Sequence, residues 1–301
     1  MPHVTAILFV LIAGVMWAAS GTAAQHFYTQ STHAPLELTQ VRLFLSSSLF
    51  FLLAWWSGGL RRGLRSLRRN LRILIKLAIF GVIGIMSVQY TYFEGIAAGD
   101  AAATTVITYT SPVIMILYMA LRHHRIPSHM EMVTVAAAVT GVFLLVTGGN
   151  PERLSVPIAC VLWSLASAVT FTFAMIYPVH LLHLFDRFFL LAVCMLMGGL
   201  SLLPITHAVT EIPSFFTPQT TLDLFVIVVL GTVVAFFTFN AGLRWLSPEE
   251  AAITATIEPV ASVLFAYIIF DTHFVPMQVL GIFLVVAAIA VPNLQKKRRA
   301  A

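Results

Sequence analysis

The sequence predicts an all-α integral membrane protein in which ten transmembrane helices form two inverted five-helix repeats. Three observations lead to this fold class. Hydrophobic residues make up 59% of the 301 residues and charged residues only 10%, against roughly 25% charged in soluble domains. Apolar runs long enough to cross a bilayer recur along the whole chain. Segments of the second half also resemble segments of the first half.

The apolar runs define the expected helices. A hydrocarbon core of roughly 30 Å requires about 20 apolar residues of a spanning helix. The first run has no Lys or Arg before it and is too long for a cleaved signal peptide, so we expect it to remain as the first helix. The ten runs are residues 4–24, 36–57, 74–97, 101–121, 129–148, 155–178, 188–208, 222–243, 249–270 and 275–293.

The distribution of basic residues sets the expected orientation, because cytoplasmic loops retain Lys and Arg. With the N-terminus inside, fifteen of the 17 basic residues fall in cytoplasmic loops or the tail, whereas only Arg153 lies outside and Arg42 lies within the second span. A miscounted helix would scatter this pattern. We therefore expect a multi-pass protein of the cytoplasmic membrane with both termini cytoplasmic. The net charge of +5 then reflects topology, and no nucleic-acid partner is expected. The inside positions are Arg61 to Lys76, Arg122, Arg125, Arg187, Arg244 and Lys296 to Arg299.

The densest basic segment, residues 58–73, is predicted to form a short helix on the membrane surface. Its leucines recur at helical spacing beside a stripe of arginines, a pattern that suits an anionic inner leaflet. A specific lipid or nucleic-acid contact is the alternative, but retention inside already explains the charge. The two stripes are Leu60, Leu64, Leu67 and Leu71, and Arg61, Arg65, Arg68 and Arg72.

An internal repeat divides the chain into residues 1–148 and 149–301. The motif "IAGVMW" that ends at Trp17 returns as "IACVLW" ending at Trp163. A shift of 147 residues aligns "GIMSVQYTYFEGI" with "GTVVAFFTFNAGL" and places Pro112 on Pro259. Each half holds five spans, and this odd number makes the second half enter the membrane in the opposite direction. The repeat is therefore inverted, as in many carriers that work by alternating access.

A further match links the last helix of each half. "GVFLLV" beginning at Gly141 is similar to "GIFLVV" beginning at Gly281, although at a shift of 140 residues. Apolar residues match one another easily, so coincidence is the alternative interpretation of this pair.

These motifs carry a resemblance to a known family. The Trp-bearing first helix of each half, the "YTYF" helix, and the "SPV" and "EPV" centres of the fourth and ninth spans resemble the EamA-type members of the drug/metabolite transporter superfamily, over roughly residues 5–292. The resemblance implies a carrier in which the first four helices of each half surround a central cavity and the fifth and tenth are peripheral. It also implies a small-molecule substrate, since family members move amino acids, other metabolites, nucleotide sugars or drugs.

Glu258 is the leading candidate for a functional residue. A carboxylate at the bilayer centre costs about 2.5 to 3.5 kcal/mol on insertion scales, so its presence there suggests a function. The next residue, Pro259, removes a backbone hydrogen bond and frees a carbonyl one turn earlier, which must face protein or water. Pro112 does the same in the fourth span, so we expect paired kinks near the midplane. Glu258 could bind a cationic group of the substrate, carry a proton through the cycle, or join neighbouring helices as a structural residue.

Other candidates lie within the spans. Arg42 could bind a substrate carboxylate through two hydrogen bonds, although snorkelling to the outer headgroups or pairing with Glu37 is the favoured interpretation. Glu94 lies near the outer end of its span and is less favoured as a substrate ligand. Polar or aromatic side chains expected to line the cavity are Trp17, Trp163, Tyr109, Tyr90, Gln89 and Asn240.

The predicted function is that of a secondary transporter. We expect it to move a small metabolite, most simply an amino acid or a related polar or organic-cation compound, as an exporter or exchanger. A channel or a lipid-scrambling protein is the alternative, but the chain has no obvious selectivity filter or charged ring. We expect no enzyme activity, cofactor or metal site, and inert roles for Cys160 and Cys194. The oligomeric state stays open, and a monomer is compatible with the sequence.

Overall fold

The computed structural model describes residues 3–67 and 71–300, and it describes the side chains of these residues except at 71, 179, 248, 249 and 292–300. Every regular element in these ranges is a helix. Within the described ranges eight helices are long and apolar enough to cross a membrane, which confirms an all-α membrane protein. Two shorter apolar helices, Arg187–Ser201 and Pro276–Val291, stand where the seventh and tenth spans are predicted.

The helices follow the predicted runs closely. The first half contains α1 (His3–Gln30), α2 (Pro35–Trp56), α3 (Gly59–Leu67), α4 (Leu71–Ile79), the π-helical segment η1 (Phe80–Met86), α5 (Ser87–Ala98), α6 (Ala101–Thr108), α7 (Ser111–Arg122) and α8 (His129–Thr147). The second half contains α9 (Ile158–Ile176), α10 (Val179–Leu182), α11 (Arg187–Ser201), the 3₁₀ turn η2 (Ile212–Phe215), α12 (Thr221–Phe225), the π-helical segment η3 (Val226–Val234), α13 (Ala235–Gly242), α14 (Pro248–Ala255), α15 (Ile257–Phe270) and α16 (Pro276–Ala300).

Local capping explains where several helices begin. Ser128 and Glu131 form a reciprocal capping box at α8, with Ser128 N donating to Glu131 Oε2 at 2.8 Å. Ser247 and Glu250 do the same at α14, where the corresponding distance is 2.9 Å. At α6, Asp100 Oδ1 accepts a hydrogen bond from Ala103 N at 2.7 Å. These caps satisfy backbone N–H groups that have no partner within the helix.

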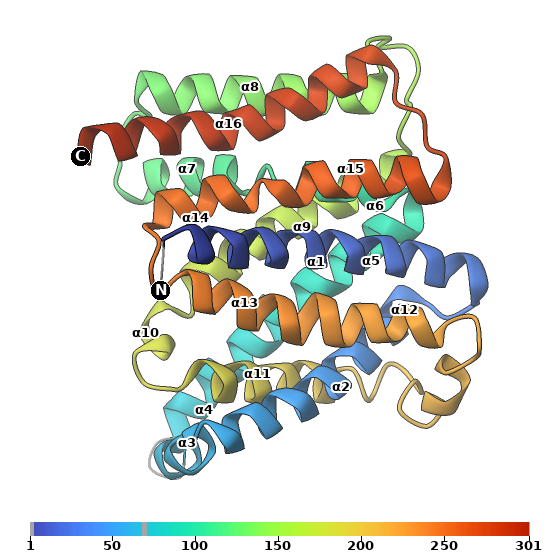
Figure 1. The fold of residues 1–301 in the computed structure, drawn as a ribbon, viewed down its shortest axis with the longest axis vertical. Helices are drawn as coiled ribbons and strands as arrows, with labels where there is room; N and C mark the ends of the chain where they lie inside the picture. Colours follow the sequence, from blue (N-terminus) through green and yellow to red (C-terminus); the bar gives the residue numbers. More distant parts are fainter. Residues whose placement is uncertain (1–2, 68–70, 301) are drawn as a thin grey trace.

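The helices lie side by side in an order that Figure 1 shows directly. At one edge α8 packs against α16, and towards the other edge α2 packs against α11. Between them, α1 lies beside α13 on one side and beside α14 and α15 on the other, while α5 packs against α9. α1 begins and α16 ends at the same end of the bundle (Figure 1).

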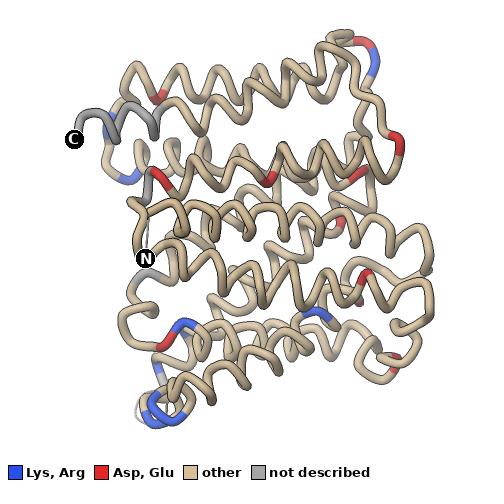
Figure 2. Tube along the Cα trace, viewed as in Figure 1, with Lys and Arg blue, Asp and Glu red and all other residues tan. Residues whose placement is uncertain are grey.

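Basic residues gather at this same end of the bundle. Figure 2 shows Lys and Arg concentrated around α3 and the neighbouring loops, and sparse at the opposite end. The helix predicted in the basic segment is present as α3, although Leu60 and Leu67 pack against the core formed around Phe185 and Phe189 rather than lying free. Arg68 and the tail side chains from Lys296 to Arg299 are also predicted to lie at the cytoplasmic face, but they lie outside the described residues.

The contact between α8 and α16 brings two glycine backbones together. A Cβ atom on Gly281 would lie 2.5 Å from Gly141 O and 2.8 Å from Leu145 N, and one on Gly141 would lie 2.6 Å from Gly281 O. Only glycine permits such a close helix crossing. The match between the two "G-x-F-L" motifs therefore corresponds to a direct, reciprocal contact.

We expect Gly281→Leu to destabilise the protein by roughly 1–3 kcal/mol or more, because the backbone atoms at this crossing cannot yield as a flexible side chain would. Thermal unfolding in detergent measures the effect as a lower Tm. Phe283→Leu, on the same helix at a side chain that is 65% exposed, serves as the control and should leave Tm nearly unchanged. An unchanged Tm in Gly281→Leu would show that the two helices can separate at no cost.

Candidate functional site

Two helices are interrupted at equivalent positions. The first break lies between α6 and α7, where Tyr109 has ψ of 1°, and the second lies between α14 and α15, where Thr256 has ψ of −4°. Tyr109 and Thr256 are 147 residues apart, the same shift that aligns the repeated motifs. A proline follows each break three residues later, at Pro112 and Pro259. Because proline has no N–H, the carbonyl four residues before it loses its helical partner.

Tyr109 connects the first break to the second. Its hydroxyl oxygen lies 2.9 Å from Ala255 O, the carbonyl that Pro259 leaves without a helical donor. The same hydroxyl lies 2.8 Å from Glu258 Oε2. A tyrosine hydroxyl has a single proton to donate, so the carbonyl and an ionised carboxylate compete for it. The structure thus brings Tyr109 and Glu258 together, and each lies at a helix break.

The first helix approaches this point closely. A Cβ atom on Gly14 of α1 would lie 2.4 Å from Ile257 Cγ2 and 3.4 Å from Glu258 N. The absence of a side chain at this position therefore lets α1 pack against the broken backbone. Glu258 itself is only partly buried, although it lies inside a predicted span.

Further hydrogen bonds link polar side chains close to Tyr109 and Glu258. Tyr92 Oη lies 2.7 Å from Thr105 Oγ1, and Ser262 Oγ donates to Thr105 Oγ1 at 3.4 Å. Neither Thr105 nor Ser262 was a sequence candidate. Their positions, one turn before Tyr109 and one turn after Glu258, place them on the helix faces of those two residues, and this spacing could have identified them.

The aromatic candidates form two separate clusters. Trp17 of α1 has ring centroids 5.6 Å from Phe236 and 5.1 Å from Phe239, while Trp163 of α9 lies 5.5 Å from Tyr90 of α5. Each tryptophan is partly exposed. Trp17 contacts α13, and Trp163 contacts α5, so each packs against the third predicted span of the other half. The contacts described for Trp17, Trp163 and Tyr90 do not include Glu258, unlike those of Tyr109.

Arg42 lies inside the bundle with only 8% of its surface exposed. Its Nε donates to Thr232 Oγ1 at 3.0 Å, and its Cζ lies 5.2 Å from the centroid of the Phe93 ring. The pairing with Glu37 considered from the sequence is not seen. Glu37 instead accepts from Ala34 N at 3.0 Å.

The two amide candidates differ. Asn240 has a hydrogen-bond partner at each of its polar atoms, because its Oδ1 accepts from Arg187 Nη1 at 2.6 Å and its Nδ2 donates to Phe236 O at 2.7 Å. Gln89 Oε1 is buried and has no partner among the described residues. An unsatisfied buried acceptor costs about 1–3 kcal/mol, so this oxygen is a polar group with an unused capacity for a hydrogen bond. Among the described residues, the other buried side-chain atoms without a hydrogen-bond partner are Tyr28 Oη, Ser46 Oγ and Ser167 Oγ.

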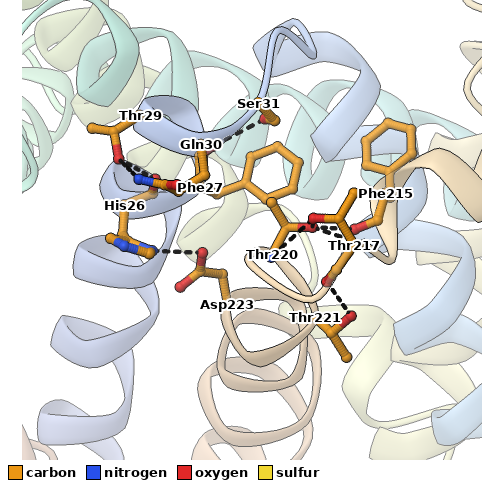
Figure 3. A network of polar contacts seen from close by, with 10 residues as sticks. All are labelled: His26, Phe27, Thr29, Gln30, Ser31, Phe215, Thr217, Thr220, Thr221 and Asp223. Carbon is orange, nitrogen blue, oxygen red and sulfur yellow. Dashed lines mark hydrogen bonds and ion pairs between the residues drawn. The ribbon is translucent and has the colours of Figure 1, made fainter.

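A polar network ties α1 to α12 at the end opposite the basic loops. Figure 3 shows His26 pointing at Asp223, and His26 Nδ1 lies 2.8 Å from Asp223 Oδ2. Beside it Thr217 and Thr220 exchange a hydrogen bond at 2.8 Å, and Thr220 Oγ1 donates to Phe215 O at 2.7 Å (Figure 3). A cavity of about 410 Å³ opens here, lined by Thr29, Gln30, Ser31, Thr32, His33, Ser214 and Thr217.

The described residues contain no group of three or more His, Cys, Asp or Glu side chains that could hold a metal ion. Cys160 and Cys194 are both buried and unpaired by disulfides. Their surroundings in the helix core suit packing residues.

Known proteins resemble this chain along its whole length. The EamA-like transporter family matches residues 4–147 and again residues 158–294. The "Uncharacterized inner membrane transporter YicL" of Salmonella typhimurium is 30% identical over 294 residues, which cover 98% of this chain and 97% of the relative. The "Uncharacterized transporter YwfM" of Bacillus subtilis is 25% identical over 304 residues, covering 98% and 97%.

Similarity in three dimensions extends equally far. A solved crystal structure with 17% sequence identity covers 97% of this chain and 98% of its own, with a TM-score of 0.62, and so shares the fold. The double family match and the relative at 30% identity identify the chain more closely. The chain therefore belongs to the EamA-like transporter family and is a multi-pass membrane protein, and the members of this family are transporters rather than enzymes.

Proposed function

We propose that the protein is a secondary transporter that moves a small solute across the inner membrane by alternating access between two inverted five-helix repeats, residues 1–148 and 149–301. The observation that carries this proposal is the contact between the two helix breaks. Tyr109 at the break of the first half bonds to Ala255 and Glu258 at the break of the second half. A solute site at the interface of two repeats is common among carriers of this kind.

The pairing of helices supports an inverted repeat. α1 packs against η3 and α13, and its counterpart α9 packs against η1 and α5. The pairs formed by α2 with α11 and by α8 with α16 each join a helix to its counterpart. The segments η1 and η3 supply a further match, because Phe80–Met86 shifted by 147 residues falls within Val226–Val234. Exchanging the two halves therefore reproduces the same neighbours.

We place α11 and α16 as the seventh and tenth spans, which gives ten in all. An even number agrees with the start of α1 and the end of α16 at one end of the bundle. The concentration of basic residues at that end supports a cytoplasmic orientation, because basic loops are retained inside. There the exposed arginines of α3 would contact anionic lipids. The oligomeric state stays open, and a monomer is compatible with this arrangement.

Glu258 is proposed to respond to a proton or to a cationic group of the solute. If Glu258 is protonated, it can donate to the Tyr109 hydroxyl, which then donates to Ala255 O. If Glu258 is ionised, it competes with Ala255 for the single Tyr109 proton. A change of charge at Glu258 would therefore change how the broken α14–α15 helix is held, which is how a bound ligand could bias the two access states.

The proposed cargo is an amino acid or a related polar or organic-cation compound, exported or exchanged. Flux from proteoliposomes loaded with candidate solutes tests the transport function itself. We expect saturable, solute-selective flux that protein-free liposomes lack. Flux that rises linearly with concentration at rates far above carrier turnover would instead indicate a channel, and movement of labelled lipid alone would indicate a scrambling protein.

A further inference from the structure

Arg42 is held in a fixed orientation by two neighbours. Its Nε atom donates to Thr232 Oγ1 at 3.0 Å, and its Cζ atom lies over the ring of Phe93, 5.2 Å from the ring centroid. Thr232 Oγ1 in turn donates to Ile227 O at 2.9 Å, five residues earlier within the π-helical segment η3. A bidentate ligand site on arginine requires such an anchored side chain, because a mobile one loses entropy on binding.

The charge of Arg42 is not balanced by a neighbouring residue. Among the described residues, no carboxylate oxygen lies within 4.0 Å of its guanidinium group, and no acceptor is described for its Nη1 or Nη2 atoms. Glu94 follows Phe93 on α5 but is not within that distance. Arginine cannot lose its proton to relieve burial as lysine can. A buried cation without a partner is strongly unfavourable, so the surroundings indicate a counter-ion that is not part of the chain.

The hydroxyl of Tyr28 is a second hydrogen-bond donor without a partner in the described part of the chain, and the Tyr28 ring packs against Phe93. Tyr28 of α1 meets Phe93 edge-on, with ring centroids 6.5 Å apart, and its hydroxyl is buried without a partner among the described residues. Gln89, one turn before Phe93 on α5, adds another buried amide oxygen without a partner. Arg42 of α2 and Tyr28 of α1 thus both bring hydrogen-bond donors to the ring of Phe93.

We propose that Arg42 and Tyr28 form a subsite for the carboxylate group of the transported solute. With Nε occupied by Thr232, the edge formed by Nη1 and Nη2 stays free, and this edge matches a carboxylate through two parallel hydrogen bonds. The inference rests on the proposed transport function and narrows it, because a solute without a carboxylate would leave the charge of Arg42 unpaired. Through Thr232, the subsite also connects to the π-helical segment of the α12–α13 helix.

Paired ligands test the carboxylate requirement. Purified protein is titrated with amino acids and other small carboxylic acids, and with the primary amide of each, while thermal unfolding is followed. We expect at least one acid to raise Tm and its amide to have no effect. Arg42→Gln should weaken the apparent affinity for that acid at least about tenfold, as expected for loss of a charge-assisted pair. Arg153→Gln, at an exposed loop arginine, is the matched control and should bind the acid normally.

Several results would overturn the subsite. These are equal stabilisation by acid and amide, no stabilisation of the wild type by any acid in the panel, or full retention of acid binding in Arg42→Gln. If Arg42→Gln does not fold, Tyr28→Phe replaces it, and unchanged acid binding there counts against the proposal. Saturable flux of a solute without a carboxylate, with no preference for acids, would overturn the subsite but would support the proposed transport function. Acid binding that depends on Arg42, without any flux, would support the subsite but contradict the proposed transport function.

Discussion

Glu258→Gln is expected to lower solute flux at least about tenfold while the protein still folds. The amide keeps the shape of the side chain but can carry neither the negative charge nor the exchangeable proton. Hydrogen bonds to charged groups contribute about 1.5–3 kcal/mol, which corresponds to roughly 10- to 100-fold in an affinity or rate. The bond at stake is the one between Tyr109 and Glu258 Oε2, at 2.8 Å. Initial rates in proteoliposomes, normalised to reconstituted protein, measure the effect.

A matched carboxylate provides the control for this variant. Glu152→Gln removes a charge from an exposed loop and should leave both flux and Tm unchanged. The response to a pH gradient then separates the two functional roles of Glu258. If Glu258 carries a proton, the gradient no longer drives flux in Glu258→Gln; if it binds a cationic group, the gradient still acts but the affinity for cationic solutes falls. Normal flux under all conditions would leave Glu258 as a structural bond between helices.

Hydropathy and charge predicted the positions of the helices well, and they failed at helix ends. The first run was expected to stop at residue 24, but α1 continues to Gln30. Its last turns are polar, and His26 bonds to Asp223 on α12, so the extension is stabilised by tertiary contacts. The seventh run was expected to reach residue 208, whereas α11 ends at Ser201. Hydropathy marks the apolar segment of a chain, and it does not report where helical hydrogen bonding stops.

The candidate site was predicted only in part. Because Pro259 removes a donor at a known position, the sequence alone indicated a free carbonyl in the ninth span. The partner of that carbonyl could not be deduced, since Tyr109 is 146 residues away from Ala255 and reaches it only through folding. The same holds for the contact of Arg42 with Thr232. The π-helical segments were also not foreseen, because a change of hydrogen-bond register leaves no mark on hydropathy.

Tyr109→Phe is expected to destabilise the protein by about 1–3 kcal/mol, because it removes the hydroxyl group that lies within hydrogen-bond distance of both Ala255 O and Glu258 Oε2. The ring stays in place, so packing changes little. Tm in detergent should fall, whereas Tyr267→Phe, at a side chain that is 53% exposed, should have almost no effect. An unchanged Tm in Tyr109→Phe would mean that water replaces the hydroxyl without cost.

A double-mutant cycle with Pro259→Ala tests the origin of this effect. Alanine at position 259 restores a backbone N–H group that can donate to Ala255 O. This carbonyl then depends less on the hydrogen bond from the Tyr109 hydroxyl. Tyr109→Phe should therefore cost less in the Pro259→Ala background than in the wild type, with a coupling energy of about 0.5–3 kcal/mol. Additive effects would show that the hydroxyl does not substitute for the missing backbone donor. A positive coupling would mean that one half of the chain supplies the hydrogen bond that proline removed from the other, so that the two breaks form a single unit.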